Sequence, residues 1–398
     1  MHARPLRLLC GGALALVSLA PVLTAQAPNI RVSGRMQLQY RLSSGDSSAS
    51  FDPAAVDNQF LVRRLRIQAD VRFGDNILLV IQPSFEMGAL RMRDAYLRVG
   101  MARGLGLTMG QEKSPFQRYE LTSSNTLPSI ERGVVISGLR LQQEAMSNLV
   151  VGNGYAAHDL GAFLDYATPD NRFAIKFGMQ GGSRESTRDV NNAKSYFARA
   201  TATVLVNADD QPVLQLGASF AARDRAICNA AAASCTSSAT TAKTFFADSS
   251  KMTTAIGLDF EWGGFRPGLH VIGDVAFGDN VPVRLRVNAP QLNTGNLFNS
   301  ADSNIVKFAS MHVVGAYRII TGTSETRLVR MVEPALRIDL TDPDTDQPEN
   351  AAYLITPAVA VHFANTVILR AGFDYYSYVL GTERFSARQF IMSWQANF

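Results

Sequence analysis

The sequence predicts an all-β chain that closes into a transmembrane antiparallel β-barrel. Long segments alternate apolar and polar residues, and the connections between them are alternately long and short. Of the 398 residues, 46% are apolar and 18% charged, with a mean hydropathy of +0.01. This composition is too polar for a bundle of membrane helices, whereas a barrel strand turns one face to lipid and the other to water.

The first 25 residues are typical of a secretory signal peptide. Arg4 and Arg7 precede an apolar run at 8–19, and small residues follow in "VLTAQA", with cleavage expected after Ala25. The mature domain then spans 26–398 and carries 36 basic against 34 acidic residues, a net charge of +2. This balance argues against a polyanionic partner such as nucleic acid.

The first two strands are expected within residues 30–42 and 60–73. In "GRMQLQYRL", Met36 and Leu38 alternate with arginine and glutamine, and "FLVRRLRIQADVRF" repeats the pattern. In the second strand we assign Leu61 and Leu65 to the apolar face. Arg63 interrupts that face, and we expect it at a membrane interface where its aliphatic stem can snorkel.

Connections sort by length along the chain. Long polar stretches, such as 43–58 and 222–251, take turns with tight turns such as "GDN" at 74–76 and "TPDN" at 168–171. Transmembrane barrels have this asymmetry between their two ends. The count is 16 strands if 133–157 belongs to a long loop, and 18 if it forms an extra hairpin.

The C-terminal region also alternates. Residues 351–369 carry no formal charge, but Pro357 and a break at "ANT" favour two strands over a membrane helix. The chain ends "RQFIMSWQANF", with Trp394 and Phe398 on one face. This ending resembles the C-terminal signature of bacterial outer-membrane proteins, which the barrel assembly machinery recognises.

Cys228 and Cys235 lie close together in an Ala/Ser-rich stretch, and an exported chain most simply joins them in a disulfide. Free thiols or a metal pair are the alternatives, although no nearby histidine suggests a zinc site. In "DLTDPDTDQPEN", Asp342, Asp344 and Asp346 are arranged to bind calcium or bridge lipopolysaccharide phosphates, or to form a solvated loop. We expect no resident metal and no cofactor.

"LTMGQEKSPFQRYELTSSNTLPSIERG" (107–133) resembles the signature of the phosphate-selective porin O and P family. "FLVRRLRI", "RDAYLRVG" (93–100) and "HDLGAFLDY" (158–166) resemble further segments of that family. Phe116-Gln117 replaces the family's usual Phe-Gly, and Glu112 replaces an aromatic residue. The chain has only six lysines, whereas phosphate-specific members rely on a lysine cluster.

The resemblance implies an outer-membrane diffusion channel of a Gram-negative-type bacterium, trimeric, with the third long loop folded inward as a constriction. Residues 113–132 occupy that position, and Lys113, Arg118 and Arg132 are the candidates to touch a solute. The alternative is that Lys113 pairs with Glu112 or Glu131, and that Arg118 tethers the loop. An adhesive or structural barrel is the second functional reading, and no histidine lies in a recognisable catalytic setting.

Six arginines are predicted to face the lumen from the first two strands, where they would attract anions by charge and by their planar forks. They are Arg31, Arg35, Arg41, Arg64, Arg66 and Arg72. The alternative is that they pair with acids across the lumen, such as Glu86, Asp94, Glu333 or Asp339, and only stiffen the wall.

Overall fold

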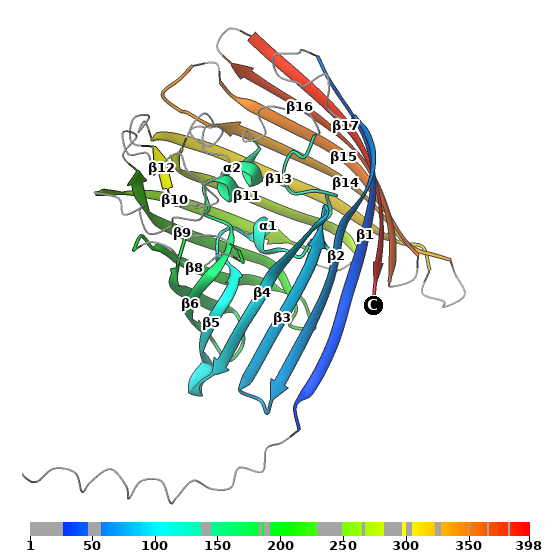
Figure 1. Cartoon of the computed structure of the whole chain (residues 1–398). Helices are drawn as coiled ribbons and strands as arrows, with labels where there is room; N and C mark the ends of the chain where they lie inside the picture. Colours follow the sequence, from blue (N-terminus) through cyan, green and yellow to red (C-terminus); the bar gives the residue numbers. More distant parts are fainter. Residues whose placement is uncertain are drawn as a thin grey trace, which may run out of the picture.

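The computed structural model shows a closed antiparallel β-barrel of sixteen strands (Figure 1). It describes residues 27–46, 57–136, 145–182, 185–186, 192–228, 249–264, 267–281, 297–299, 305–322, 328–348, 350–363, 366–380 and 383–398. The predicted signal peptide lies outside these residues, as does the pairing of Cys228 with Cys235. Among the described helices, none has the length and apolar character needed to span a bilayer.

Successive strands pair around the ring. The strands are β1 (Asn29–Gly45), β2 (Asn58–Phe73), β3 (Ile77–Glu86), β4 (Ala89–Gly100), β5 (Leu105–Lys113), β6 (His158–Ala167), β7 (Phe173–Gln180), β8 (Ser195–Val206), β9 (Pro212–Cys228), β10 (Ser249–Trp262), β11 (Gly268–Asn280), β13 (Val306–Ile320), β14 (Val329–Asp342), β15 (Ala352–Phe363), β16 (Val367–Leu380) and β17 (Glu383–Asn397). A short β12 (Leu297–Asn299) pairs in parallel with β9, outside the ring of sixteen. A 3-10 turn (Ala102–Gly104) joins β4 to β5.

The ring closes between the first and last strands. β1 pairs with both β2 and β17, and the backbones of Gly34 and Phe398 exchange two hydrogen bonds of 2.7 and 3.0 Å. Trp394 and Phe398 lie on the outer face, 40% and 64% exposed. The predicted amphipathic final strand is therefore confirmed, as are the two strands predicted within 351–369.

The two faces of the wall differ as the alternation predicted. In β1, Arg35, Gln37 and Gln39 are buried toward the interior, whereas Met36 and Leu38 are more than a third exposed on the outside. A band of exposed apolar side chains is the surface that lipid contact requires. The sorting of connections by length is only partly correct, because β3–β4 and β16–β17 are joined by two residues each at the end with long connections.

Residues 114–136 and 145–157, here called the inner segment, lie between β5 and β6 in the chain and form no strand, in agreement with the count of sixteen. The segment holds α1 (Arg118–Leu121) and α2 (Met146–Gly152), which lie within the barrel (Figure 1). Its apolar side chains, including Phe116 and Leu149, pack with Phe163 and Phe308 from the wall. A second cluster joins Val134 and Ile136 to β15–β17. Both clusters bury apolar area that would otherwise face lumen water.

Candidate functional site

The inner segment and the wall of β1–β5 enclose a cavity of about 720 Å³. Its lining carries eight Lys or Arg side chains and five Asp or Glu side chains, because β1–β4 turn their charged positions inward. The apolar clusters press the inner segment against the opposite wall and against β15–β17. β1–β4 therefore supply most of the charged wall of this cavity.

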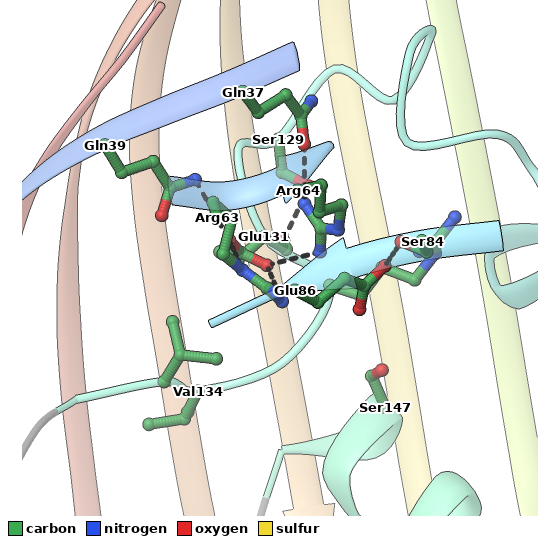
Figure 2. A network of polar contacts seen from close by, with 12 residues as sticks. Gln37, Gln39, Arg63, Arg64, Ser84, Glu86, Ser129, Glu131, Val134 and Ser147 are labelled. Atoms are coloured by element: carbon green, nitrogen blue, oxygen red, sulfur yellow. Dashed lines mark hydrogen bonds and ion pairs between the residues drawn. The ribbon is translucent and has the colours of Figure 1, made fainter. Parts of the chain in front are cut away.

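Glu131 holds the inner segment to β1 and β2. Its carboxylate accepts hydrogen bonds from Arg63 Nε at 2.6 Å, Arg64 Nη2 at 2.9 Å and Arg41 Nη2 at 3.2 Å, and Figure 2 shows the guanidinium groups of Arg63 and Arg64 converging on it. We call these four residues the Glu131 clamp. Gln39 donates a further bond of 3.0 Å, so every carboxylate oxygen is saturated.

Charge–charge attraction sets the protonation state of this carboxyl. Burial opposes ionisation of Glu131, but the positive charges of Arg63, Arg64 and Arg41 outweigh that effect. They hold the pKa of Glu131 well below its usual range. Glu120 behaves in the same way: burial opposes its ionisation, and Lys113 and Arg132 lower its pKa. Glu120 and Glu131 are therefore both ionised at neutral pH.

A β-bulge brings Arg63 into the clamp. The pairing register between β1 and β2 shifts at Gln37 and Leu38, where Gln37 opposes Arg64 and Leu38 opposes Val62. Arg63 is the extra residue, and a bulge turns the residues beyond it to the opposite face. Our placement of Arg63 on the lipid face was therefore wrong, and Val62 rather than Leu61 continues the exposed apolar row.

The six arginines predicted to face the lumen differ in the carboxylates with which they pair. Arg41 and Arg64 belong to the Glu131 clamp, and Arg66 pairs with Glu86, which also binds Arg93. The pairing alternative is therefore confirmed for Arg66 with Glu86. Of the other expected acids, Glu333 pairs with Arg318, and Asp339 pairs with Arg337 and His312. Arg31 and Arg72 lie exposed at the short-turn end of their strands.

Arg35 has no carboxylate partner among the described residues. Its Nη1 donates to Ser123 Oγ at 3.1 Å, and its buried Nε has no hydrogen-bond partner. The β-ladder places Arg35 directly opposite Arg66, so two guanidinium groups are neighbours on the wall. A buried cation with an unused donor is costly unless an anion or water satisfies it.

Arg132 is the second cavity cation with no acid partner in the described chain. Its Nε donates to the Tyr119 carbonyl at 3.2 Å, and Nη2 donates to the Thr122 carbonyl. Lys113 binds Glu120 at 2.6 Å, neither of the two acids expected for it. Arg118 pairs with Glu261 on β10, which is the predicted tether of the loop to the wall.

Several polar groups of the interior were not anticipated. On β8–β13, Arg199 binds Asp259 at 2.5 and 2.8 Å, and His270 Nε2 lies 3.1 Å from Glu261. The rings of Tyr119 and His312 are in tilted contact, with centroids 3.9 Å apart. Their inward positions follow from strand alternation, but their partners lie on other strands, so only the register identifies them. The described residues hold no group of three or more metal-binding side chains, and Asp342, Asp344 and Asp346 form none.

Comparison with known proteins gives one family and one fold. The sequence profile of the family described as phosphate-selective porin O and P matches residues 30–252. No curated protein matches the chain significantly.

Solved structures with the same fold are outer-membrane proteins. The channel DcaP of Acinetobacter baumannii has a TM-score of 0.56 at 11% identity, covering 94% of this chain and 98% of that one. OmpT of Vibrio cholerae has a TM-score of 0.54 at 12% identity over 95% and 100% of the two chains. An anion-selective porin from Comamonas acidovorans gives 0.54 at 10% identity over 93% and 100%. At these identities the likeness establishes the barrel alone.

Proposed function

Because this chain belongs to the phosphate-selective porin O and P family and folds as a closed barrel, it is an outer-membrane diffusion channel, and we propose that it prefers anions. The proposed solutes are small and hydrophilic, with inorganic phosphate or polyphosphate as the candidates that the family suggests. The cavity along β1–β4 is the proposed route. Fold and family are those of channels, and we propose no catalytic role.

The observation that carries the anion preference is the state of Arg35 and Arg132. Both line the cavity, and among the described residues neither has a carboxylate within salt-bridge distance. An uncompensated guanidinium raises the local concentration of anions and lowers that of cations. The arginines of the Glu131 clamp contribute less, because one carboxylate already neutralises part of their charge.

The inner segment is proposed to be the constriction. It fills the interior on the side of β6–β13 through its apolar cluster and is tied to β1 and β2 by the Glu131 clamp. Solutes would then pass between this segment and the β1–β4 wall, along Lys113 and Arg132, whereas Arg118 faces β10 through Glu261. Such a narrowing sets solute size, while the wall charges set ionic preference.

The remaining sequence predictions join this proposal. Residues 1–25 would direct export to the outer membrane of a Gram-negative-type bacterium, and Trp394 and Phe398 would mark the last strand for the barrel assembly machinery. The band of exposed apolar side chains on the outside of the barrel would contact lipid and lipopolysaccharide. Three copies of the chain would associate as a homotrimer. Cys228 and Cys235 would form a disulfide.

The test is ion selectivity of the refolded protein in a planar bilayer, from reversal potentials in a dilute KCl gradient. We expect discrete conductance steps with anion preference in the native channel. A unit charge about 7 Å from the path contributes about 0.6 kcal/mol in water, with opposite signs for anion and cation, so Arg35→Gln should lower the anion-to-cation permeability ratio roughly sevenfold. Block by added phosphate would support a phosphate solute.

The matched control is Arg388→Gln, which removes the same charge from an arginine stacked on Tyr375, 5.8 Å from the ring centroid. Arg388 lies on the outer face, so this variant should keep the native permeability ratio. Equal ratios for the native channel and Arg35→Gln would overturn the anion-attracting role of Arg35. A folded barrel without conductance steps would instead favour the adhesive reading, with the long connections as the binding surface.

A further inference from the structure

The cavity also holds an acid without a basic partner. Asp94 on β4 lines it with a side chain 26% exposed, and no lysine or arginine of the described chain lies within salt-bridge distance. Its nearest charged contact is His158 Nε2, 3.7 Å from Oδ1, and a pair at that distance needs a protonated imidazole. Asp94 therefore offers a carboxylate to a mobile cation in the same cavity where Arg35 offers a guanidinium to an anion.

We propose that the cavity recognises small zwitterionic solutes, amino acids or dipeptides, with the ammonium group at Asp94 and the carboxylate at Arg35. This inference rests on the proposed channel function and names a class of solute for the same route. A zwitterion satisfies both unpartnered groups in one binding event. A simple anion satisfies Arg35 alone, and a simple cation satisfies Asp94 alone.

The strand register fixes the spacing of the two groups. Arg35 pairs with Arg66, Arg66 with Ser84, and Gln82, two residues before Ser84, pairs with Asp94. Three strand steps of about 4.8 Å and two residues of about 3.4 Å give Cα atoms roughly 16 Å apart in a flat sheet. Both side chains line the cavity, so an extended solute lying along the wall can contact both charged ends.

Between the two groups the wall carries Arg66, which Glu86 neutralises, and the uncharged amides of Gln68 and Gln82. Gln82 Nε2 donates to Gln68 Oε1 at 2.5 Å, and Gln68 donates to Asp70 at 2.8 Å. Gln68 and Gln82 line the cavity. Their amides can hydrogen-bond the peptide unit of a dipeptide without competing for either of its charges. A dipeptide or a medium-length ω-amino acid lying along the wall therefore fits better than glycine.

The experiment compares three probes with the same four-carbon chain as blockers of the single-channel current: 4-aminobutanoate, butanoate and butylammonium. We expect 4-aminobutanoate to block at a concentration about fivefold lower than either single-charge probe, the effect of one additional exposed ion pair of about 1 kcal/mol. Across glycine, 4-aminobutanoate and 6-aminohexanoate, block should strengthen after glycine as the charge spacing grows.

Substitutions at two residues, Asp94 and Arg35, assign the charges. Asp94→Asn should reduce block by 4-aminobutanoate to the level of butanoate, and Asp94→Glu should restore it. Arg35→Gln should reduce it to the level of butylammonium. The control Asp170→Asn changes the same charge at an exposed turn outside the cavity and should leave the block unchanged.

Equal block by 4-aminobutanoate and butanoate in the native channel would overturn the zwitterion proposal while leaving anion preference intact. Absence of conductance from a folded barrel would count against the proposed function instead, so the two failures are distinguishable. Folding of each variant is checked by the heat-dependent electrophoretic mobility that compact barrels show. Asp94→Glu restores the carboxylate even if Asp94→Asn fails to fold, so loss of block in Asp94→Glu would also overturn the assignment.

Discussion

Replacing Glu131 by Gln should release the inner segment from the wall. The substitution keeps the shape of the side chain but removes the charge that three arginines share, at distances of 2.6, 2.9 and 3.2 Å. Breaking a buried ion pair by removing one partner costs about 3–5 kcal/mol, because the remaining charges stay buried without compensation. The sixteen-strand ladder is untouched, so the cost should appear as local opening of the segment.

Hydrogen exchange of the backbone amides measures this opening. At about 1.4 kcal/mol per factor of ten, protection at residues 114–136 should fall by two to three and a half orders of magnitude in Glu131→Gln, with strand protection unchanged. Asp170→Asn, which changes a carboxylate at an exposed turn, is the control and should alter neither region. Native protection in Glu131→Gln would refute the clamp as the main anchor of the segment.

Three further predictions concern the same architecture. The pKa of Glu131 is depressed in the folded protein, so its contribution to the stability of the inner segment is complete above the ordinary carboxyl pKa. That contribution is lost only as the pH falls through the much lower pKa of the folded state. Exchange protection of the native inner segment should therefore be equal at pH 7 and pH 5 after correction for intrinsic rates. Gly154 has φ +76 and a Cβ there would lie 1.4 Å from Arg223 Nη1, so Gly154→Ala should raise exchange near α2, whereas Ala157→Gly should not. A Cβ on Gly34 would lie 2.3 Å from the Phe398 ring, so Gly34→Val should lower the yield of refolded barrel measured by heat-dependent mobility; an unchanged yield would mean that closure tolerates a displaced terminal ring.

The alternation of apolar and polar residues predicted most of the fold, because a strand shows its period of two without any information about the neighbouring strands. It placed Met36 outside and Gln37 inside without any information about β17. It failed at Arg63, because a bulge depends on the register between two strands and not on one strand's own sequence. The four residues RRLR at 63–66 allow two phases, and the adopted phase brings both Arg63 and Arg64 to Glu131.

The sequence predicted that arginines line the interior, but it did not predict which acids pair with them. Positions of inward arginines follow from alternation, yet the acids that neutralise them come from a distant part of the chain: Glu131 reaches β1 and β2 from the inner segment. Lys113 binds Glu120, seven residues along, because the α1 turn folds back over the end of β5. Distance along the sequence does not rank the candidate acids for each arginine. It therefore could not show that Arg66 has a carboxylate partner and that Arg35 has none among the described residues.

Pairing decides which charges of this barrel can act on a solute. A row of arginines suggests one continuous anion path, but Arg41, Arg63 and Arg64 hold the inner segment to the wall, and Arg66 shares Glu86 with Arg93. The guanidinium groups left over are Arg35 and Arg132, and the carboxylate left over is Asp94, within the described chain. Neutralising a clamp arginine should therefore change the loop before it changes selectivity, whereas neutralising Arg35 should change selectivity with the loop in place.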